Sequence, residues 1–278
     1  MKIQISDKKK KEMFVSLFQI LKNCSSIINT TFNSESLHIQ GMDKSRVCLF
    51  DVKINSTWFN SFEITKNINL SFDSSVFYSI VSTKSDSQDL IITMEDDNED
   101  IIHITFIPQE KESKKGDFKG HDCFKGHDCF KGHDCFKKFF KMPLTEYDYD
   151  EMAIPTVEYD AEFSISSKQI TEMFSQLTNF GNDIIIKCSE EDISLTTNGI
   201  SGEMRVDIPI DDLSGYSIVE DEEIKLTYSL SYINKMCITN KLSNDIEFAL
   251  SNDCPMKITY DLGDNSLLQF YMAPKMNE

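Results

Sequence analysis

Two hydrophobic periodicities alternate along this chain, and each predicts a different kind of element. Four segments carry apolar residues three and four positions apart, which is the spacing of an amphipathic helix. They are residues 8–23, residues 73–83, a segment that begins at Ser166 or Ser167 and ends at Gly181, and residues 229–239. Most other segments are short runs of alternating apolar and polar residues between turn residues, as in antiparallel strands. We expect strands at 1–6, 26–32, 36–40, 46–54, 57–64, 67–72, 90–94, 101–107, 161–165, 183–189, 192–197, 200–208, 245–251, 255–261 and 266–272.

The second half of the chain repeats the order of elements in the first. A strand followed by a helix opens each half, and the segment NINLSFDSSVFYSIVSTK (67–84) parallels EIKLTYSLSYINKMCITN (223–240). We therefore expect an α+β protein with two similar β-rich domains, 1–141 and 161–278, each with two helices.

Residues 142–160 are expected to connect the two domains as an exposed strand. This connector combines carboxylates, which disfavour burial, with a short apolar group of Met152, Ile154 and Pro155, which favours contact with an apolar surface. The carboxylates are those of Glu146, Asp148, Asp150, Glu151, Glu158 and Asp160. The combination indicates an exposed docking edge.

The charge balance limits how the protein can bind nucleic acid. With 28 Lys and Arg against 46 Asp and Glu, the formal net charge is -18, so the whole surface cannot grip phosphates. Positive charge does gather at residues 8–11, which fits either a DNA-facing helix turn or an ordinary solvated one. No apolar run is long enough for a membrane span and the start is unlike a signal peptide, so we expect a soluble intracellular protein with reduced, mostly buried cysteines.

A perfect hexapeptide repeat interrupts the first domain. GHDCFK occurs three times from residue 120 to residue 137, within an insert at about 116–139. Its His, Asp and Cys side chains are metal ligands in kind, but the paired spacings of zinc sites are missing, so we expect a surface loop without metal. The acidic run 95–100 is likewise interpreted as a hairpin tip in water, and no cofactor is expected.

Three segments carry a family resemblance. They are LHIQGMDKSRVCLFDV (37–52), EMAIPTVEYDAEFSI (151–165) and LLQFYMAPK (267–275). Together they resemble the proliferating cell nuclear antigen family, the eukaryotic and viral DNA sliding clamps. The resemblance covers nearly the whole chain apart from the insert. Its most specific features are Met42 with Asp43, Ile154 with Pro155, and the terminal Ala273–Pro274–Lys275.

The resemblance implies the DNA-clamp fold and a head-to-tail homotrimeric ring around duplex DNA. Its helices would line the hole, and the lysines matching a positive lining are Lys8, Lys11, Lys22, Lys84, Lys168, Lys235 and Lys241. The lining is thin, because the two later helices of the domains hold a single lysine, Lys235. The edge strands that would join subunits lie at 138–144 on one copy and at 202–206 on the next. Their named residues are Phe140 and Met142 on the first, and Gly202, Met204 and Val206 on the second.

The resemblance also implies protein partners and a place for them. A DNA polymerase, other replication and repair proteins and a clamp loader would act on the ring. Clients would offer a short peptide with a glutamine and aliphatic and aromatic anchors to an apolar pocket beneath the connector. The matching residues are Met42, Val47, Leu49, Met152, Ile154, Pro255, Tyr271, Ala273, Pro274 and Lys275.

Three functional classes remain open on the residues alone. The first is a non-enzymatic ring clamp in the nucleus, or at a cytoplasmic replication site if the protein is viral. The second is a monomeric or hetero-oligomeric clamp-fold processivity factor that binds DNA through a basic face. The third, an enzyme, rests only on carboxylate clusters, without a nucleophile–base pair, a phosphate-cradling loop or a metal triad.

Overall fold

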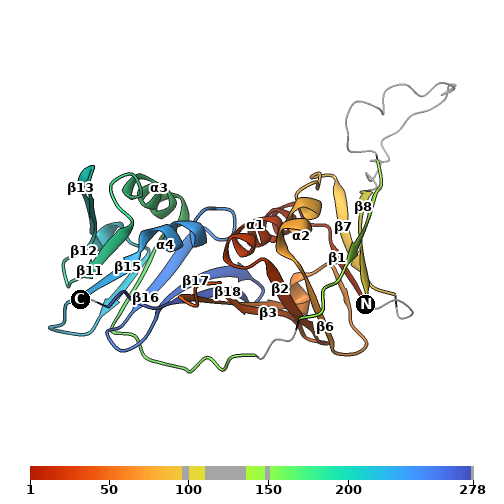
Figure 1. Cartoon of the computed structure of the whole chain (residues 1–278), viewed down its shortest axis with the longest axis horizontal. Helices are drawn as coiled ribbons and strands as arrows, with labels where there is room; N and C mark the ends of the chain where they lie inside the picture. The colour runs from red at the N-terminus through yellow and green to blue at the C-terminus, as the bar shows by residue number, and fades with distance from the viewer. Residues whose placement is uncertain (96–99, 110–135, 148–150, 277–278) are drawn as a thin grey trace, which may run out of the picture.

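The computed structural model describes residues 1–95, 100–109, 136–147 and 151–276 (Figure 1). The repeat-bearing insert was expected at about 116–139, and its residues up to 135 lie outside the described residues. Residues 96–99 of the expected acidic turn also lie outside them, as do Asp148 and Asp150 of the connector. The last residues assigned to the insert, 138 and 139, already belong to a strand.

The described part of the first half contains nine strands and two α-helices. Their bounds are β1 (Lys2–Ile5), α1 (Lys8–Cys24), β2 (Ile27–Phe32), β3 (Ser36–Met42), β4 (Cys48–Asn55), β5 (Ser61–Glu63), β6 (Ile68–Asp73), α2 (Ser74–Val81), β7 (Gln88–Thr93), β8 (Ile101–Pro108) and β9 (Lys138–Pro143).

The second half has the same order. Its elements are β10 (Ala161–Ser166), α3 (Ser167–Leu177), β11 (Asp183–Cys188), β12 (Asp192–Gly199), β13 (Gly202–Pro209), β14 (Gly215–Ile218), β15 (Ile224–Ser229), α4 (Leu230–Met236), β16 (Asp245–Leu250), β17 (Met256–Gly263) and β18 (Ser266–Met272).

The sheet topology shows the internal duplication directly. The first half pairs its strands as β5-β1-β7-β8-β9 and β4-β3-β2-β6, and the second as β14-β10-β16-β17-β18 and β13-β12-β11-β15. Adding nine to each label of the first half gives the labels of the second. The two halves join where β18 pairs antiparallel with β4, which makes one nine-stranded sheet from β14 to β6.

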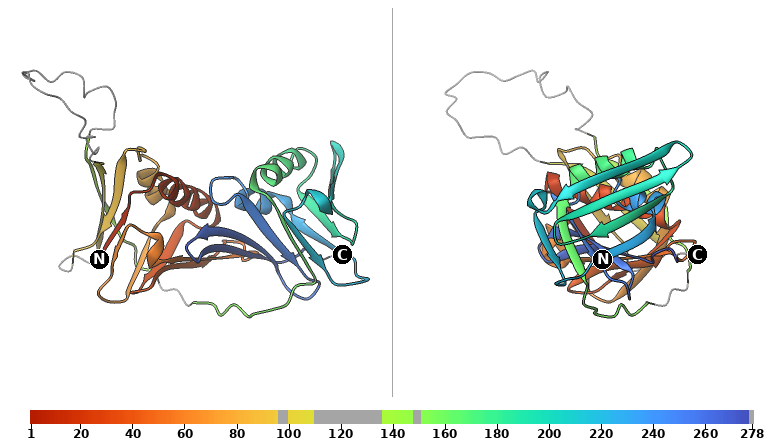
Figure 2. Two further views of the ribbon diagram at one scale, coloured as in Figure 1. Left: turned by 180° about the vertical axis from the view of Figure 1, so that it is seen from behind. Right: turned by 90° about the vertical axis from the view of Figure 1, so that its left-hand side faces the viewer.

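The four described helices lie on one side of this long sheet, and the connector runs along the other (Figures 1 and 2). Apolar periodicity explains the placement, because α1 turns Phe14, Leu17 and Phe18 toward the sheet and buries them. Phe18 meets Phe77 of α2 with ring centroids 4.4 Å apart. In the second half, Phe163 stacks on Phe248 at 4.9 Å. Each half therefore has its own core of helices on a sheet.

Local chemistry sets where the helices of the first half begin. The Asp7 side chain accepts a hydrogen bond from Lys10 N at 2.8 Å, and the Asp73 side chain caps α2 in the same way. Within the described residues, no helix combines the length and the apolar character that crossing a bilayer requires.

Four local expectations were wrong. The connector is not a strand beyond β9, because its described residues 144–147 and 151–160 form none. Residues 57–64 do not form one strand, because Trp58 closes a 3-10 turn and buries its ring, with Nε1 donating to the Leu262 carbonyl at 2.9 Å. The short strand β14, which pairs with β10, was not expected. Gly181 does not end α3, which stops at Leu177. A Cβ on Gly181 would come within 2.5 Å of Thr197 Oγ1, so close approach to β12 explains this glycine.

The pairing of Gly41 with Phe50 provides a test of the sheet core. A Cβ on Gly41 would lie 2.4 Å from Phe50 Cζ, and Phe50 is itself buried. We expect Gly41→Ala to lower the free energy of unfolding by about 1–3 kcal/mol, because the ring must leave its packed position. Urea denaturation would measure the change. Gly215→Ala is the matched control, since that strand glycine has its nearest atom at 3.8 Å; equal midpoints for both variants would contradict the expectation.

Candidate functional site

The helix side of the molecule carries most of the lysines expected to face DNA. Lys168, Lys235 and Lys241 are exposed there. Others are partly neutralised: Lys8 Nζ lies 2.6 Å from Asp86 Oδ2, and Lys84 Nζ lies 3.2 Å from Asp86 Oδ1. Lys22 Nζ sits over the ring of Tyr78, 3.8 Å from its centroid. The positive lining is thus sparser than the number of lysines suggests.

The expectation that Lys11 faces DNA was wrong. Its side chain is fully buried, and Nζ donates to the carbonyl oxygens of Asp86, at 2.8 Å, and Gln88. Burial removes water from the Lys11 ammonium, and this desolvation is the main cause that lowers its pKa. The sequence held a signal for this position, because Lys11, Phe14 and Phe18 follow the helical spacing of the apolar stripe.

Uncharged polar groups supply much of the remaining helix surface. The exposed residues of α2 are Ser75, Val76 and Ser79, and those of α3 include Gln169, Ser175 and Gln176. Hydroxyl and amide groups can reach phosphate oxygens directly or through water without releasing counterions. This face therefore favours weak, mobile contact with a polyanion over tight binding.

Two sheet edges lie at opposite ends of the long axis (Figure 1). Among the described strands, β9 has one hydrogen-bonded neighbour, β8, and β13 has one, β12. Phe140 packs edge-on against Phe106, with ring centroids 6.1 Å apart. Phe139, which lies within the predicted interface segment 138–144, is 72% exposed. Such edges can accept another strand.

The predicted interface residues differ in what they offer at these edges. Met142 is buried in its own half, so at the β9 edge it offers its backbone rather than its side chain. On β13, Gly202 is exposed, whereas Met204 and Val206 are half-buried and pack against the core.

The connector covers an apolar pocket of about 290 Å³. Seven of its lining residues were predicted: Met42, Val47, Leu49, Ile154, Pro255, Tyr271 and Ala273. Six others were not predicted as pocket residues: Arg46, Ala153, Pro155, Val157, Tyr159 and Cys254. Four segments distant in sequence line the pocket: 42–49, 153–159, 254–255 and 271–273. The first and last meet because β4 pairs with β18, so that Leu49 stands opposite Tyr271.

Three of the expected pocket residues do not line this cavity. Met152 instead exchanges two hydrogen bonds with the side chain of Gln40, at 3.0 and 2.7 Å. Lys275 Nζ binds Asp183 Oδ2 at 2.6 Å, so its charge is directed to its own chain. Pro274, between the cavity and Lys275, is also absent from the lining.

The loop before β4 is held in place by one carboxylate. Asp43 is buried and accepts hydrogen bonds from the backbone N–H groups of Ser45, Val47 and Cys48, at 2.7–2.8 Å. Arg46, in the same loop, adopts a φ of 56°. A buried carboxylate with three N–H donors fixes the shape of the pocket wall before any ligand arrives.

The connector is also anchored by a histidine. His38 Nε2 lies 2.7 Å from Asp51 Oδ1, and its Nδ1 lies 3.4 Å from Glu151 Oε1. The hydrogen bond to Asp51 is the main cause that raises the pKa of His38. Together with Gln40, this group attaches the middle of the connector, at Glu151 and Met152, to β3.

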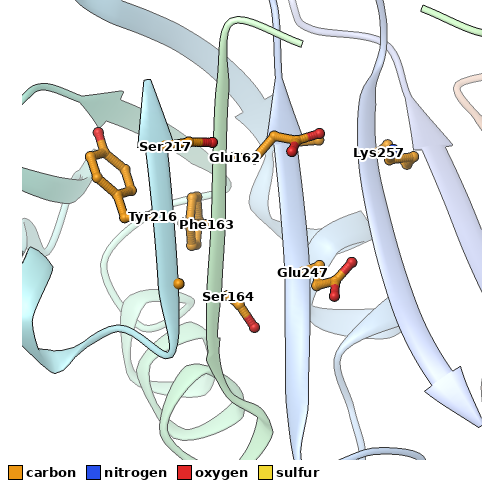
Figure 3. A pocket seen from close by; sticks show the side chains of 9 residues that line it. Glu162, Phe163, Ser164, Tyr216, Ser217, Glu247 and Lys257 are labelled. Atoms are coloured by element: carbon orange, nitrogen blue, oxygen red, sulfur yellow. The ribbon is translucent and has the colours of Figure 1, made fainter. Parts of the chain in front are cut away.

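A second cleft of about 290 Å³ lies on the outer face of the second-half sheet (Figure 3). Glu162, Glu247 and Lys257 line it beside Ser164 and Ser217. Lys257 Nζ extends to the ring of Tyr159, 4.6 Å from its centroid. Its charged walls do not suit aliphatic and aromatic anchors, whereas the mostly apolar lining of the pocket under the connector does.

Comparison with known proteins identifies the chain. The family model for the N-terminal domain of proliferating cell nuclear antigen matches residues 7–122, and the model for the C-terminal domain matches residues 153–275. The chain belongs to the proliferating cell nuclear antigen family. Proliferating cell nuclear antigen from Chaetomium thermophilum is 22% identical over 276 residues, covering 96% of this chain and 95% of that protein.

A solved structure confirms the clamp fold. The complex of PCNA2 and PCNA3 from Sulfolobus tokodaii contains a chain that superposes with a TM-score of 0.81 at 19% identity, with 99% of both chains covered. The predicted α+β fold of two similar domains is therefore confirmed, as is the family. The protein is a DNA sliding clamp, a processivity factor of DNA replication. The alternative of a monomeric or hetero-oligomeric clamp-fold factor that binds DNA through a basic face is not favoured. Members of this family are scaffolds for other proteins.

The anchoring of the clamp's connector should depend on pH. Because the pKa of His38 is raised in the folded protein, its contact with Asp51 and Glu151 stabilises fully below the ordinary histidine pKa of about 6.5 and is lost as pH rises through the raised value. We expect His38→Gln to cost about 1 kcal/mol of unfolding free energy at pH 6 and much less at pH 8.5. Urea denaturation of both proteins at the two pH values would measure this difference. A difference that stays constant with pH would show that the histidine charge has no part.

Proposed function

We propose that three copies of this clamp close head to tail into a ring whose hole holds duplex DNA. The observation that carries the proposal is the internal duplication. Inside the chain, β18 at the end of the second half pairs with β4 of the first. The equivalent strands, β9 and β13, have no such partner among the described strands of one copy. Joining β9 of one copy to β13 of the next repeats the internal junction between molecules.

The correspondence can be followed residue by residue from the strand registers. Leu70 and Leu226 are equivalent positions, because each lies three residues before a helix N-cap. The residue pairs across the sheets lead from Leu70 to Val52 in β4, and in the same way from Leu226 to Val206 in β13. Val52 and Val206 are therefore equivalent. Phe140-Lys-Met142 of β9 matches Phe270-Tyr-Met272 of β18. Phe140 and Phe270 stand opposite Ile104 and Ile258 of the preceding strands.

This correspondence predicts the register between subunits. Within the chain Phe270 stands opposite Phe50, so Phe140 should stand opposite Met204 of the next copy. In that register Lys141 faces Glu203 and Lys137 faces Asp207. Phe139, exposed on β9, faces Arg205. Opposite charges directly across a strand pair stabilise it, and a guanidinium over an aromatic face adds to this.

A ring explains how this acidic protein holds DNA. Three copies with four described helices each bring twelve helices to the hole. DNA that passes through a closed ring cannot leave without opening a junction or reaching an end, so weak contacts from Lys168, Lys235 and Lys241 are sufficient and permit sliding. We infer that the clamp is loaded by a separate loader, has no catalytic activity of its own, and works in the nucleus or at a viral replication site.

The pocket under the connector would tether the clients. An apolar cavity with half-buried Tyr271 at its edge fits aliphatic and aromatic anchors of a short peptide. A DNA polymerase that carries such a peptide would stay with the template as the ring slides. Other replication and repair proteins would use the same pocket in turn.

The junction can be tested by reversing one charge on each side. Lys141→Glu and Glu203→Lys should each place like charges opposite one another and shift the trimer toward monomer at submicromolar concentration, while the double variant should restore the trimer. Sedimentation or light scattering would measure the mass. Lys53→Glu, an exposed lysine on the central strand β4, is the control. If the two single variants remain trimeric at every dilution, or the double variant is no better than either, the proposed register is wrong.

The pocket can be tested with Tyr271→Ala. Removing this ring should lower the affinity for a synthetic client peptide by at least about tenfold, with the trimer intact. The peptide carries a glutamine, one aliphatic anchor and two aromatic anchors. Fluorescence anisotropy of the labelled peptide would measure affinity. Tyr216→Ala, a half-buried tyrosine at the cleft of Figure 3, is the matched control. Unchanged affinity for Tyr271→Ala would place client docking elsewhere.

A further inference from the structure

The pocket under the connector contains one charged residue among its described lining. Twelve of the thirteen lining residues are uncharged, and most are aliphatic, aromatic or proline. The exception is Arg46. Sequence resemblance did not identify this position, and its charge is unlike both the apolar cavity that it borders and the acidic balance of the whole chain.

The backbone around Arg46 is firmly held. Its own N–H donates to the Asp43 carbonyl at 3.0 Å, while the Asp43 side chain binds the N–H groups on both sides of it. Ser45 Oγ also accepts a hydrogen bond from Tyr232 Oη of α4 at 2.8 Å. The loop therefore presents Arg46 from a fixed position, which lowers the entropy lost when a ligand binds it.

The guanidinium of Arg46 is available to a ligand. The side chain is exposed, and no hydrogen bond or ion pair joins it to the described residues. Lys275, the cation that resemblance placed at the pocket edge, is different because it is paired with Asp183 at 2.6 Å. Arg46 is thus the unpaired cation at the wall of the described cavity.

A peptide that fills the cavity must also remove water from Arg46. An arginine that loses hydration without gaining an acceptor weakens binding, whereas a carboxylate can take two of its N–H groups in a charge-assisted pair. Among peptides with the same apolar anchors, those with an acidic side chain at the position that meets this loop should therefore bind more tightly than those without one.

We propose that Arg46 selects clients whose docking peptide carries an aspartate or glutamate beside its apolar anchors. This inference rests on the proposed function, in which the pocket docks client peptides. The carboxylate would pair with the guanidinium while the anchors fill the cavity between Leu49, Ile154 and Tyr271. Affinity would come from the anchors, and choice among clients from the charge.

A peptide panel tests the proposal. Each peptide keeps the glutamine, aliphatic and two aromatic anchors, and a single glutamate or its isosteric glutamine is placed in turn at every other position. With the unaltered trimer, one position or two neighbouring positions should favour glutamate by about tenfold, and the preference should shrink as salt increases. Anisotropy of labelled peptides gives each affinity.

Variants assign that preference to Arg46. In Arg46→Gln the preference for glutamate should disappear while the glutamine peptides bind as before, and in Arg46→Glu it should reverse. Lys44→Gln removes a neighbouring exposed lysine that does not line the cavity, and it should leave the preference unchanged. Preserved trimer mass shows that each variant folds.

The outcomes separate this inference from the proposed function. If Tyr271→Ala leaves every peptide unaffected, the pocket is not the docking site and both ideas fail. If Tyr271→Ala weakens all peptides but no position favours glutamate, or the preference persists in Arg46→Gln, the pocket stands and the role of Arg46 is overturned. A preference shown only by a phosphoserine or a C-terminal carboxylate would also overturn the commitment to an acidic side chain.

Discussion

The antiparallel pairing of β4 with β18 is the contact on which the rest of this clamp depends. It runs from Cys48 opposite Met272 to Lys53 opposite Leu267, with Phe50 and Phe270 facing each other in the middle. This pairing joins a sheet of each half into one continuous nine-stranded sheet. It also brings Leu49 beside Tyr271, so the pocket under the connector is a direct consequence of how the two halves join.

The pairing of β4 with β18 inside the chain and the proposed pairing of β9 with β13 between subunits differ in the residues that face each other. Tyr271 opposite Leu49 is an apolar contact inside one chain, whereas the equivalent positions on the free edges are Lys141 and Glu203. Apolar burial favours a permanent junction, while exposed ion pairs contribute little stability and respond to salt. A ring that must open to admit DNA needs the second kind of junction.

The whole chain, the helix face and the pocket under the connector differ in their charge. The net charge of -18 keeps the molecule from adhering to DNA along its outside. The helix face has a few exposed lysines among hydroxyls, amides and the carboxylate of Glu172. Asp86 pairs with Lys8 of α1 and with Lys84, which follows α2, and so neutralises part of their positive charge. Among the residues that the structure describes, Arg46 is the one charged member of the pocket wall and has no ion-pair partner. The charge on each surface thus suits the contact proposed for it.

The sequence by itself determined the elements and their repetition. Helical spacing placed α1 and α2, and the parallel between 67–84 and 223–240 revealed two alike halves, because these signals are local. Resemblance to a family supplied seven pocket residues. Only the tertiary structure decided that Lys11 is buried, that Met142 faces its own core, that Lys275 pairs with Asp183 and that Arg46 borders the pocket. Those outcomes depend on contacts between residues far apart in the chain, and the periodicity of one segment does not record what packs against it.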